Sequence, residues 1–192
     1  MNKKIEIEIP EGKVAEWKVI NGVTTLVLVD EKDNRPVTER IKTFEDAVKA
    51  TGMTLPFDDN QLSYLPKDVV AYMKLRIIAA ALNGLTEDTI DEFPKFTDGE
   101  YRYYPWFYLY TQEEIDEMDE KNKKTLMMFG DASRPGAICG LAASSSYYVL
   151  SDSTAYVSAR LAVKSESLAT YFGQQFIDIW SDYVALPRKD DK

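Results

Sequence analysis

The dipeptide Asn21-Gly22 is the feature that most narrows the folds open to this chain. It separates two runs rich in apolar residues, 16–20 and 23–29. Both central residues of a type I′ turn need positive φ, and Asn followed by Gly adopts such values readily. The sequence therefore predicts an antiparallel β-hairpin within the first thirty residues.

The segments on either side of this hairpin also have extended patterns. Residues 4–9 alternate between charged and apolar residues, which predicts an edge strand with Ile5, Ile7 and Ile9 on its inner side. A turn at residues 33–36 precedes a short extended piece that we expect to reach Ile41. Together these segments predict a β-rich N-terminal part, residues 1–42.

Two helices are expected in the middle of the chain. Thr43 has the character of an N-cap for a short helix to Ala50, with Gly52 as its stop. Residues 67–82 have helical periodicity and end at Asn83-Gly84, which predicts a core helix. Its expected inner face consists of Val69, Val70, Met73, Ile77, Ile78, Ala81 and Leu82.

Later segments predict two further helices joined by less regular chain. Residues 53–65 and 85–100 are typical of loops, with one turn of helix in the second. A capping box at Thr111 predicts a charged helix to about Lys124. Ser165 is expected to cap an amphipathic helix that ends near Val184. The expected inner face of that helix consists of Leu168, Phe172, Phe176, Ile179 and Tyr183.

The run of residues 101–110 contains mostly aromatic side chains, with Pro105 inside it. Pro cannot donate to a central ladder, so this run is expected to be an edge strand or a bent segment. Core or edge packing is favoured over ligand stacking for these rings, since aromatic side chains serve cores so often. Short strands are also predicted at residues 125–129 and 159–163.

These elements predict a single α+β domain over residues 1–192. Strands come first, helices follow, and short strands with a closing amphipathic helix come last. The main body is expected to span residues 43–192 and to include a Ser/Tyr-rich segment at 130–163.

Composition excludes several classes of function. The chain has no His and one Cys, which removes the usual general base, the usual zinc ligands and every Cys–His dyad. The net charge of −9, without a cluster of Lys and Arg, argues against nucleic acid and anionic membranes as partners. No phosphate-binding loop or nucleophile elbow is present. We therefore expect no catalytic residues, no metal and no cofactor.

The segment 136–161 is the strongest candidate for a contact surface. It combines Ser, Thr and Tyr with small residues and contains no Lys or Glu. Rings that supply area, next to hydroxyls that supply hydrogen bonds, are typical of protein paratopes. An ordinary meander of short strands with polar outward positions explains the composition equally well. The predicted contact residues are Ser144, Ser145, Ser146, Tyr147, Tyr148, Asp152, Ser153, Thr154 and Tyr156.

Four blocks of the chain resemble a known family. Residues 37–47, 72–83, 101–120 and 159–184 resemble uncharacterised proteins encoded in phage, prophage and related genomic regions of gut anaerobes. The segment 130–156 is similar to the variable regions of diversity-generating retroelement targets. Those regions are displayed on C-type-lectin-like folds and bind varied ligands. The resemblance therefore implies a phage-associated binding protein, with a C-type-lectin-like fold as the implied architecture.

Three functions remain open from the sequence. The first is a non-enzymatic recognition protein that binds a protein or glycan on a host surface, as a component of a virion or as a homo-oligomer. The second is a structural or assembly protein of a phage particle. The third is a small acidic inhibitor of a host factor, which would mimic nucleic acid. The N-terminus has no apolar core segment, so we expect synthesis in the cytoplasm without a signal peptide, and no membrane insertion.

Overall fold

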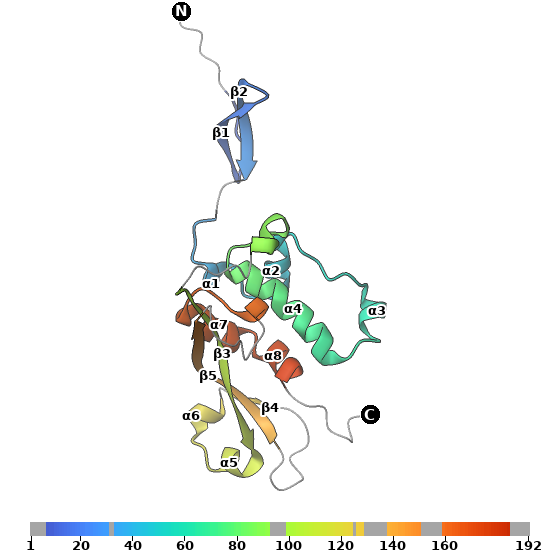
Figure 1. Cartoon of the computed structure of the whole chain (residues 1–192), viewed down its shortest axis with the longest axis vertical. Helices are drawn as coiled ribbons and strands as arrows, with labels where there is room; N and C mark the ends of the chain where they lie inside the picture. The colour runs from blue at the N-terminus through green and yellow to red at the C-terminus, as the bar shows by residue number, and fades with distance from the viewer. Residues whose placement is uncertain are drawn as a thin grey trace, which may run out of the picture. The chain divides into compact units, whose positions relative to one another are not determined.

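The computed structural model is an α+β protein that divides into two compact units, residues 1–36 and residues 37–192 (Figure 1). The structure describes residues 7–30, 33–92, 99–124, 126–128, 138–150 and 159–184. Within these ranges the side chains of residues 30, 91, 92, 128, 138, 139, 143–150 and 159 are not described. The boundary between the two units lies after residue 36, whereas the sequence predicts a β-rich N-terminal part that ends at residue 42.

The first unit is built around the predicted hairpin. Strand β1 (Lys13–Ile20) pairs with β2 (Val23–Asp30) in an antiparallel ladder that begins at Ile20 and Val23. Asn21 and Gly22 have φ values of 52° and 79°, as a type I′ turn requires. The hairpin prediction is thus confirmed.

The predicted edge strand before the hairpin is wrong for the part that the structure describes. Ile7 and Ile9 lie outside any strand, and their side chains are 53% and 45% exposed. Ile5 lies outside the described residues. Alternation alone does not make a strand when no neighbouring strand offers hydrogen bonds.

The second unit begins with a helix where the sequence predicts extended chain. Helix α1 (Val37–Arg40) is a single turn, and the amide of Ile41 donates to the carbonyl of Val37 at 2.9 Å. Ile41 is buried, at 1% exposure, in the core of this unit. Burial of that side chain assigns residues 37–42 to the second unit and corrects the extended piece.

Helix α2 (Phe44–Thr51) has the ends that the sequence predicts. The hydroxyl of Thr43 accepts from the amide of Asp46, and the Asp46 carboxylate accepts from the amide of Thr43 in return. Gly52 closes the helix in the left-handed region, with φ of 75°. The following segment is not entirely loop, because Asp58 caps one helical turn, α3 (Asp59–Leu62).

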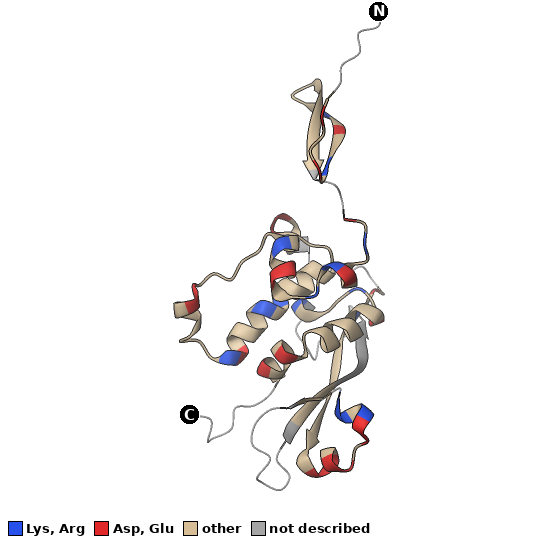
Figure 2. Cartoon of the chain, turned by 180° about the vertical axis from the view of Figure 1, so that it is seen from behind, with Lys and Arg blue, Asp and Glu red and all other residues tan. Residues whose placement is uncertain are grey.

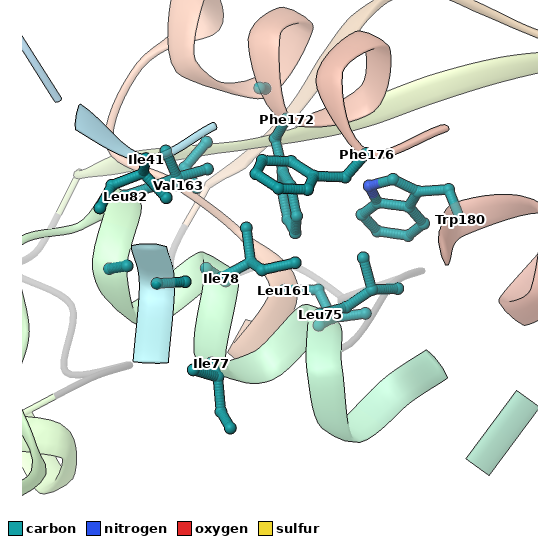
Figure 3. Close-up of a cluster of buried hydrophobic side chains, with 14 residues drawn as sticks. Ile41, Leu75, Ile77, Ile78, Leu82, Leu161, Val163, Phe172, Phe176 and Trp180 are labelled. Carbon is teal, nitrogen blue, oxygen red and sulfur yellow. The ribbon is translucent and has the colours of Figure 1, made fainter. Parts of the chain in front are cut away.

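Helix α4 (Lys67–Leu82) is the centre of the core, as predicted, and it packs against α2 and α8. Its second half is buried on every side, so the core extends beyond the single apolar face that was expected. Val69, in contrast, is 39% exposed. In Figure 3, Leu75 and Ile78 of α4 face the rings of Phe172 and Trp180.

The sheet of this unit has the strand order β3-β5-β4. Strand β3 (Tyr101–Thr111) is an edge strand and pairs along its whole length with β5 (Ile138–Leu150), while β4 (Met127–Met128) pairs only with Leu141 and Gly140. Pro105 therefore stands in an edge strand, as predicted. A 3₁₀ turn, η1 (Glu87–Glu92), lies between α4 and this sheet.

The charged helix predicted after Thr111 is present in two pieces. The capping box of Thr111 and Glu114 opens α5 (Gln112–Asp116), and Asp119 caps a second turn, α6 (Glu120–Lys123). The chain between them leaves the helical path.

The C-terminal part corrects one prediction and refines another. Residues 159–163 are not a strand: Ala159–Leu161 form a 3₁₀ turn, η2, and Val163 makes a single bridge to Tyr103 of β3. Ser165 caps α7 (Glu166–Gln175), as expected, but the helix is interrupted at Phe176 before α8 (Ile177–Val184). Helix α7 packs against both β3 and β5 (Figure 1).

Candidate functional site

Five of the predicted contact residues lie in strand β5, next to the aromatic strand β3. Ser145 stands opposite Trp106, Ser146 opposite Pro105, Tyr147 opposite Tyr104 and Tyr148 opposite Tyr103. The structure describes the backbone of Ser144–Tyr148 but not the side chains. Residues 138–150 form one continuous strand, so this part of the segment is not a meander of short strands.

The other predicted contact residues are not placed. Asp152, Ser153, Thr154 and Tyr156 lie outside the described residues. The same holds for the side chain of Cys139, which the sequence leads us to expect in an apolar environment.

Strand β5 contains two bulges, and one of them falls at a predicted contact residue. The register moves from Trp106–Ser145 to Phe107–Ala143, which leaves Ser144 as an extra residue, and Cys139 is extra at the second shift. A bulge bends the strand and re-aims neighbouring side chains, and bulges are common beside functional sites. The sequence gives no sign of either bulge.

The partner strand β3 exposes rings over its second half. Trp106 is 44% exposed and Tyr108 is 51% exposed, whereas Arg102 and Tyr104 are buried. The rings of Tyr108 and Tyr110 lie 6.1 Å apart. The aromatic run therefore does two things: some rings pack inward, as predicted, and others remain at the surface beside the Ser/Tyr strand.

The inward rings connect this sheet to the core. The ring centroids of Phe107 and Trp180 lie 5.2 Å apart. Tyr103 also packs against the buried cluster that contains Trp180. The backbone of Tyr103 exchanges two hydrogen bonds with Val163, at 3.0 and 2.7 Å. The strand that carries the exposed rings is thus fixed from behind by packing and by backbone hydrogen bonds.

A packing glycine closes the other end of this strand pair. A Cβ at Gly140 would lie 2.7 Å from Cδ1 of Ile115, a buried residue of α5. A side chain at position 140 would therefore require the Ile115 side chain to move.

The second unit also contains a hollow that is not predicted from the sequence. It consists of two adjoining cavities of about 560 and 420 Å³ between α2, the chain of residues 53–66 and α4. In the wall of this hollow, the Nζ atom of Lys74 lies 5.6 Å from the centroid of the Phe44 ring. Both cavities are lined by Phe44, Glu45, Leu55, Asp59 and Leu62. The lining of the larger cavity combines apolar side chains with Lys67, Lys74 and Asp182.

The tyrosines with shifted pKa values are structural. Burial raises the pKa of Tyr171, and the nearby charge of Asp46 raises it further. The Tyr171 hydroxyl donates a hydrogen bond to the carbonyl of Ile41 at 2.7 Å. Burial raises the pKa of Tyr183 in the same direction, with smaller contributions from Tyr72 and Asp68. Both hydroxyls therefore hold their protons at neutral pH.

Within the described ranges, the structure has no cluster of three or more His, Cys, Asp or Glu side chains suited to a metal ion. Among those same residues, no helix is long and apolar enough to cross a membrane. Comparisons with family models, with curated proteins and with solved structures gave no match. The geometry of the β3–β5 surface is therefore the basis for a functional assignment.

Proposed function

We propose that this protein is a non-enzymatic recognition protein whose contact surface is the exposed part of the β3–β5 strand pair. The observation that carries the proposal is the exposure of Trp106 and Tyr108 beside a strand that contains Ser144–Tyr148. Tyr and Trp supply rigid contact area at low entropic cost, and Ser supplies adaptable hydrogen bonds.

The support behind the strands favours the same function. A surface binds with less loss of affinity when its residues are ordered before the ligand arrives. Packing of Phe107 on Trp180 and of α7 on both strands provides that order. The bulge at Ser144 gives a local change of direction within an otherwise regular ladder.

The ligand that fits this surface is a protein or glycan exposed on a host cell. Exposed rings with adjacent hydroxyls suit a partner that offers both apolar faces and hydrogen-bonding groups. The phage origin, the attachment to a virion and the C-type-lectin-like architecture are parts of the same proposal. Their support is the sequence resemblance together with a small antiparallel sheet packed on helices.

The test replaces the exposed rings and measures binding and stability separately. We expect fluorescently labelled chain to bind a printed glycan array or intact cells of gut anaerobes. Trp106→Ala and Tyr108→Ala should each weaken that binding by about 30-fold, the effect of an interface hot spot of about 2 kcal/mol. Both side chains are about half exposed, so each variant should lose less stability than the about 3–5 kcal/mol typical of a fully buried ring.

Tyr64→Ala is the matched control, because this tyrosine is 82% exposed and lies between α3 and α4, outside the described strands. It should bind as the unchanged protein does. Equal binding by all three variants would refute the proposal.

Replacement of Ser144, Ser145 and Ser146 by Ala should weaken binding without loss of stability, and a collapse of stability would assign these residues to the core instead.

A further inference from the structure

The N-terminal hairpin exposes large apolar side chains. Trp17 is 71% exposed, Val19 is 72% exposed and Val23 is 63% exposed. Scattered exposed apolar residues are normal on protein surfaces, but several on one small element mark an interaction site. None of these residues belongs to the β3–β5 surface.

The ladder sorts these residues onto two different faces. Residues directly opposite each other in an antiparallel pair share a face. Ala15 lies opposite Leu28, Trp17 opposite Leu26 and Val19 opposite Thr24. These six residues, which we call the Trp17 face, carry no charge. Lys13 and Asp30, opposite each other at the open end of the hairpin, lie on the same side of the ladder.

The opposite face is different in character. It carries the ion pair of Glu16 and Lys18, whose charged groups lie 3.7 Å apart, near its middle. Its other residues are Val14, Ile20, Val23, Thr25, Val27 and Val29. An exposed ion pair is suited to water and contributes little to stability. The two faces therefore differ near their middle: the opposite face carries an ion pair there, whereas the Trp17 face carries Trp17 and Leu26.

The hairpin is too small to be stable with this face in water. The described sheet of the first unit has two strands, and isolated two-stranded hairpins are marginal at best. Units of fewer than about 40 residues do not bury enough surface to fold without added support. Covering the Trp17 face would supply apolar burial at about 25 cal/mol per Å².

We propose that the Trp17 face packs against the same face of a second copy of this chain, so that the two hairpins form a two-layered, four-stranded sandwich. A two-fold interface uses the same patch on both partners, so it requires a patch that is complementary to itself. An uncharged apolar face meets this requirement. Trp is also the residue type most enriched among interface hot spots.

The distribution of charge favours a second copy over a different partner. Residues 1–36 contain six Lys or Arg and seven Asp or Glu, whereas the remaining residues contain 17 and 25. Pairing of two hairpins therefore meets little electrostatic repulsion, although the rest of the chain is strongly acidic. The hairpin carries no net charge that would select a strongly charged partner, and Figure 2 shows mostly uncharged ribbon along it.

The test measures the mass of the full chain in solution by sedimentation velocity and light scattering, from about 1 to about 100 μM. We expect twice the chain mass of 21.9 kDa at the upper concentrations. Trp17→Lys and, independently, Val19→Lys should raise the dissociation constant at least about 30-fold, because each places a charge in the dry centre of the interface. Far-UV circular dichroism at 222 nm verifies that the second unit stays folded, since every described helix lies in residues 37–184.

Val23→Lys is the matched control, because it adds the same charge to the same hairpin on the opposite face. It should retain the doubled mass. A mass of 21.9 kDa for the unchanged protein at every concentration would overturn the proposal, as would a doubled mass in both Trp17→Lys and Val19→Lys. Dissociation caused equally by Val23→Lys would overturn the assignment of the Trp17 face.

Discussion

Truncation of Phe172 should destabilise the second unit more than any surface change. Phe172 is fully buried, and its ring centroid lies 5.0 Å from that of Trp180 and 6.1 Å from that of Phe176. Phe→Ala substitutions in well-packed cores cost about 3–5 kcal/mol, through lost transfer free energy and the cavity left behind. Because neighbours on α4, α7 and α8 surround this ring, collapse of the cavity would need movement of several elements. We expect a loss of about 4 kcal/mol.

The assay is urea unfolding followed at 222 nm, where the signal comes from the helices of this unit. With a slope of about 2 kcal/mol/M, Phe172→Ala should lower the midpoint by about 2 M. Phe172→Leu keeps most of the volume and should cost about 1.5 kcal/mol or less, so it serves if the alanine variant fails to fold. Tyr64→Ala, at an 82% exposed position, should leave the midpoint unchanged. A loss below about 1.5 kcal/mol for Phe172→Ala would show that this ring is not central to the core.

Two further predictions concern polar groups of the same unit. Asn83→Leu should cost about 1–3 kcal/mol in urea unfolding, because the Asn83 amide donates to the buried carbonyl of Ala162 at 3.0 Å; an unchanged midpoint would contradict this. The hydrogen bond from the backbone amide of Lys42 is the main reason that the pKa of Asp46 lies below its ordinary value of 3.8, and the amide of Thr43 adds to the effect. The stabilisation from this carboxylate is therefore complete above pH 3.8 and is lost as pH falls through the lower folded-state pKa. Urea midpoints measured across that interval should fall less in Asp46→Asn than in the unchanged protein, and parallel profiles would refute the assignment.

Features set by a few adjacent residues could be predicted from the sequence. The turn at Asn21-Gly22 and the capped ends of α2 depend on local backbone geometry and short-range hydrogen bonds. Helix α4 was predicted from a long, mostly apolar run between Pro66 and Asn83-Gly84, although its buried second half keeps no single apolar face. The edge position of β3 follows from the missing amide of Pro105.

Features set by distant contacts could not be predicted in this way. Residues 159–163 have a strand-like composition, yet the observed backbone is fixed by η2 and by one bridge to Tyr103. The interruption of the last helix at Phe176 comes three residues after Gly173, and no Pro or cap residue marks it. The exposure of Trp106 beside the burial of Tyr104 depends on what covers each half of β3, which the strand sequence does not contain.

The sequence predicted residues for only one strand of the candidate site. Composition alone indicated the Ser/Tyr-rich residues, and the structure added that Ser144–Tyr148 stand in a ladder with β3. The exposed rings of Trp106 and Tyr108 were favoured for packing instead, because a sequence does not show which aromatic residues of a run remain uncovered.

Ser144, the extra residue of the bulge, is a position at which β5 can be shortened without a change of register on either side. Deleting Ser144 would bring Ala143 and Ser145 together, and both would keep their present partners, Phe107 and Trp106. Deleting one residue at Tyr147 would instead transfer every residue on one side of the cut to the other face of the sheet. Anyone grafting a new binding sequence into this strand should therefore make single-residue adjustments at position 144, where the register on both sides can be kept.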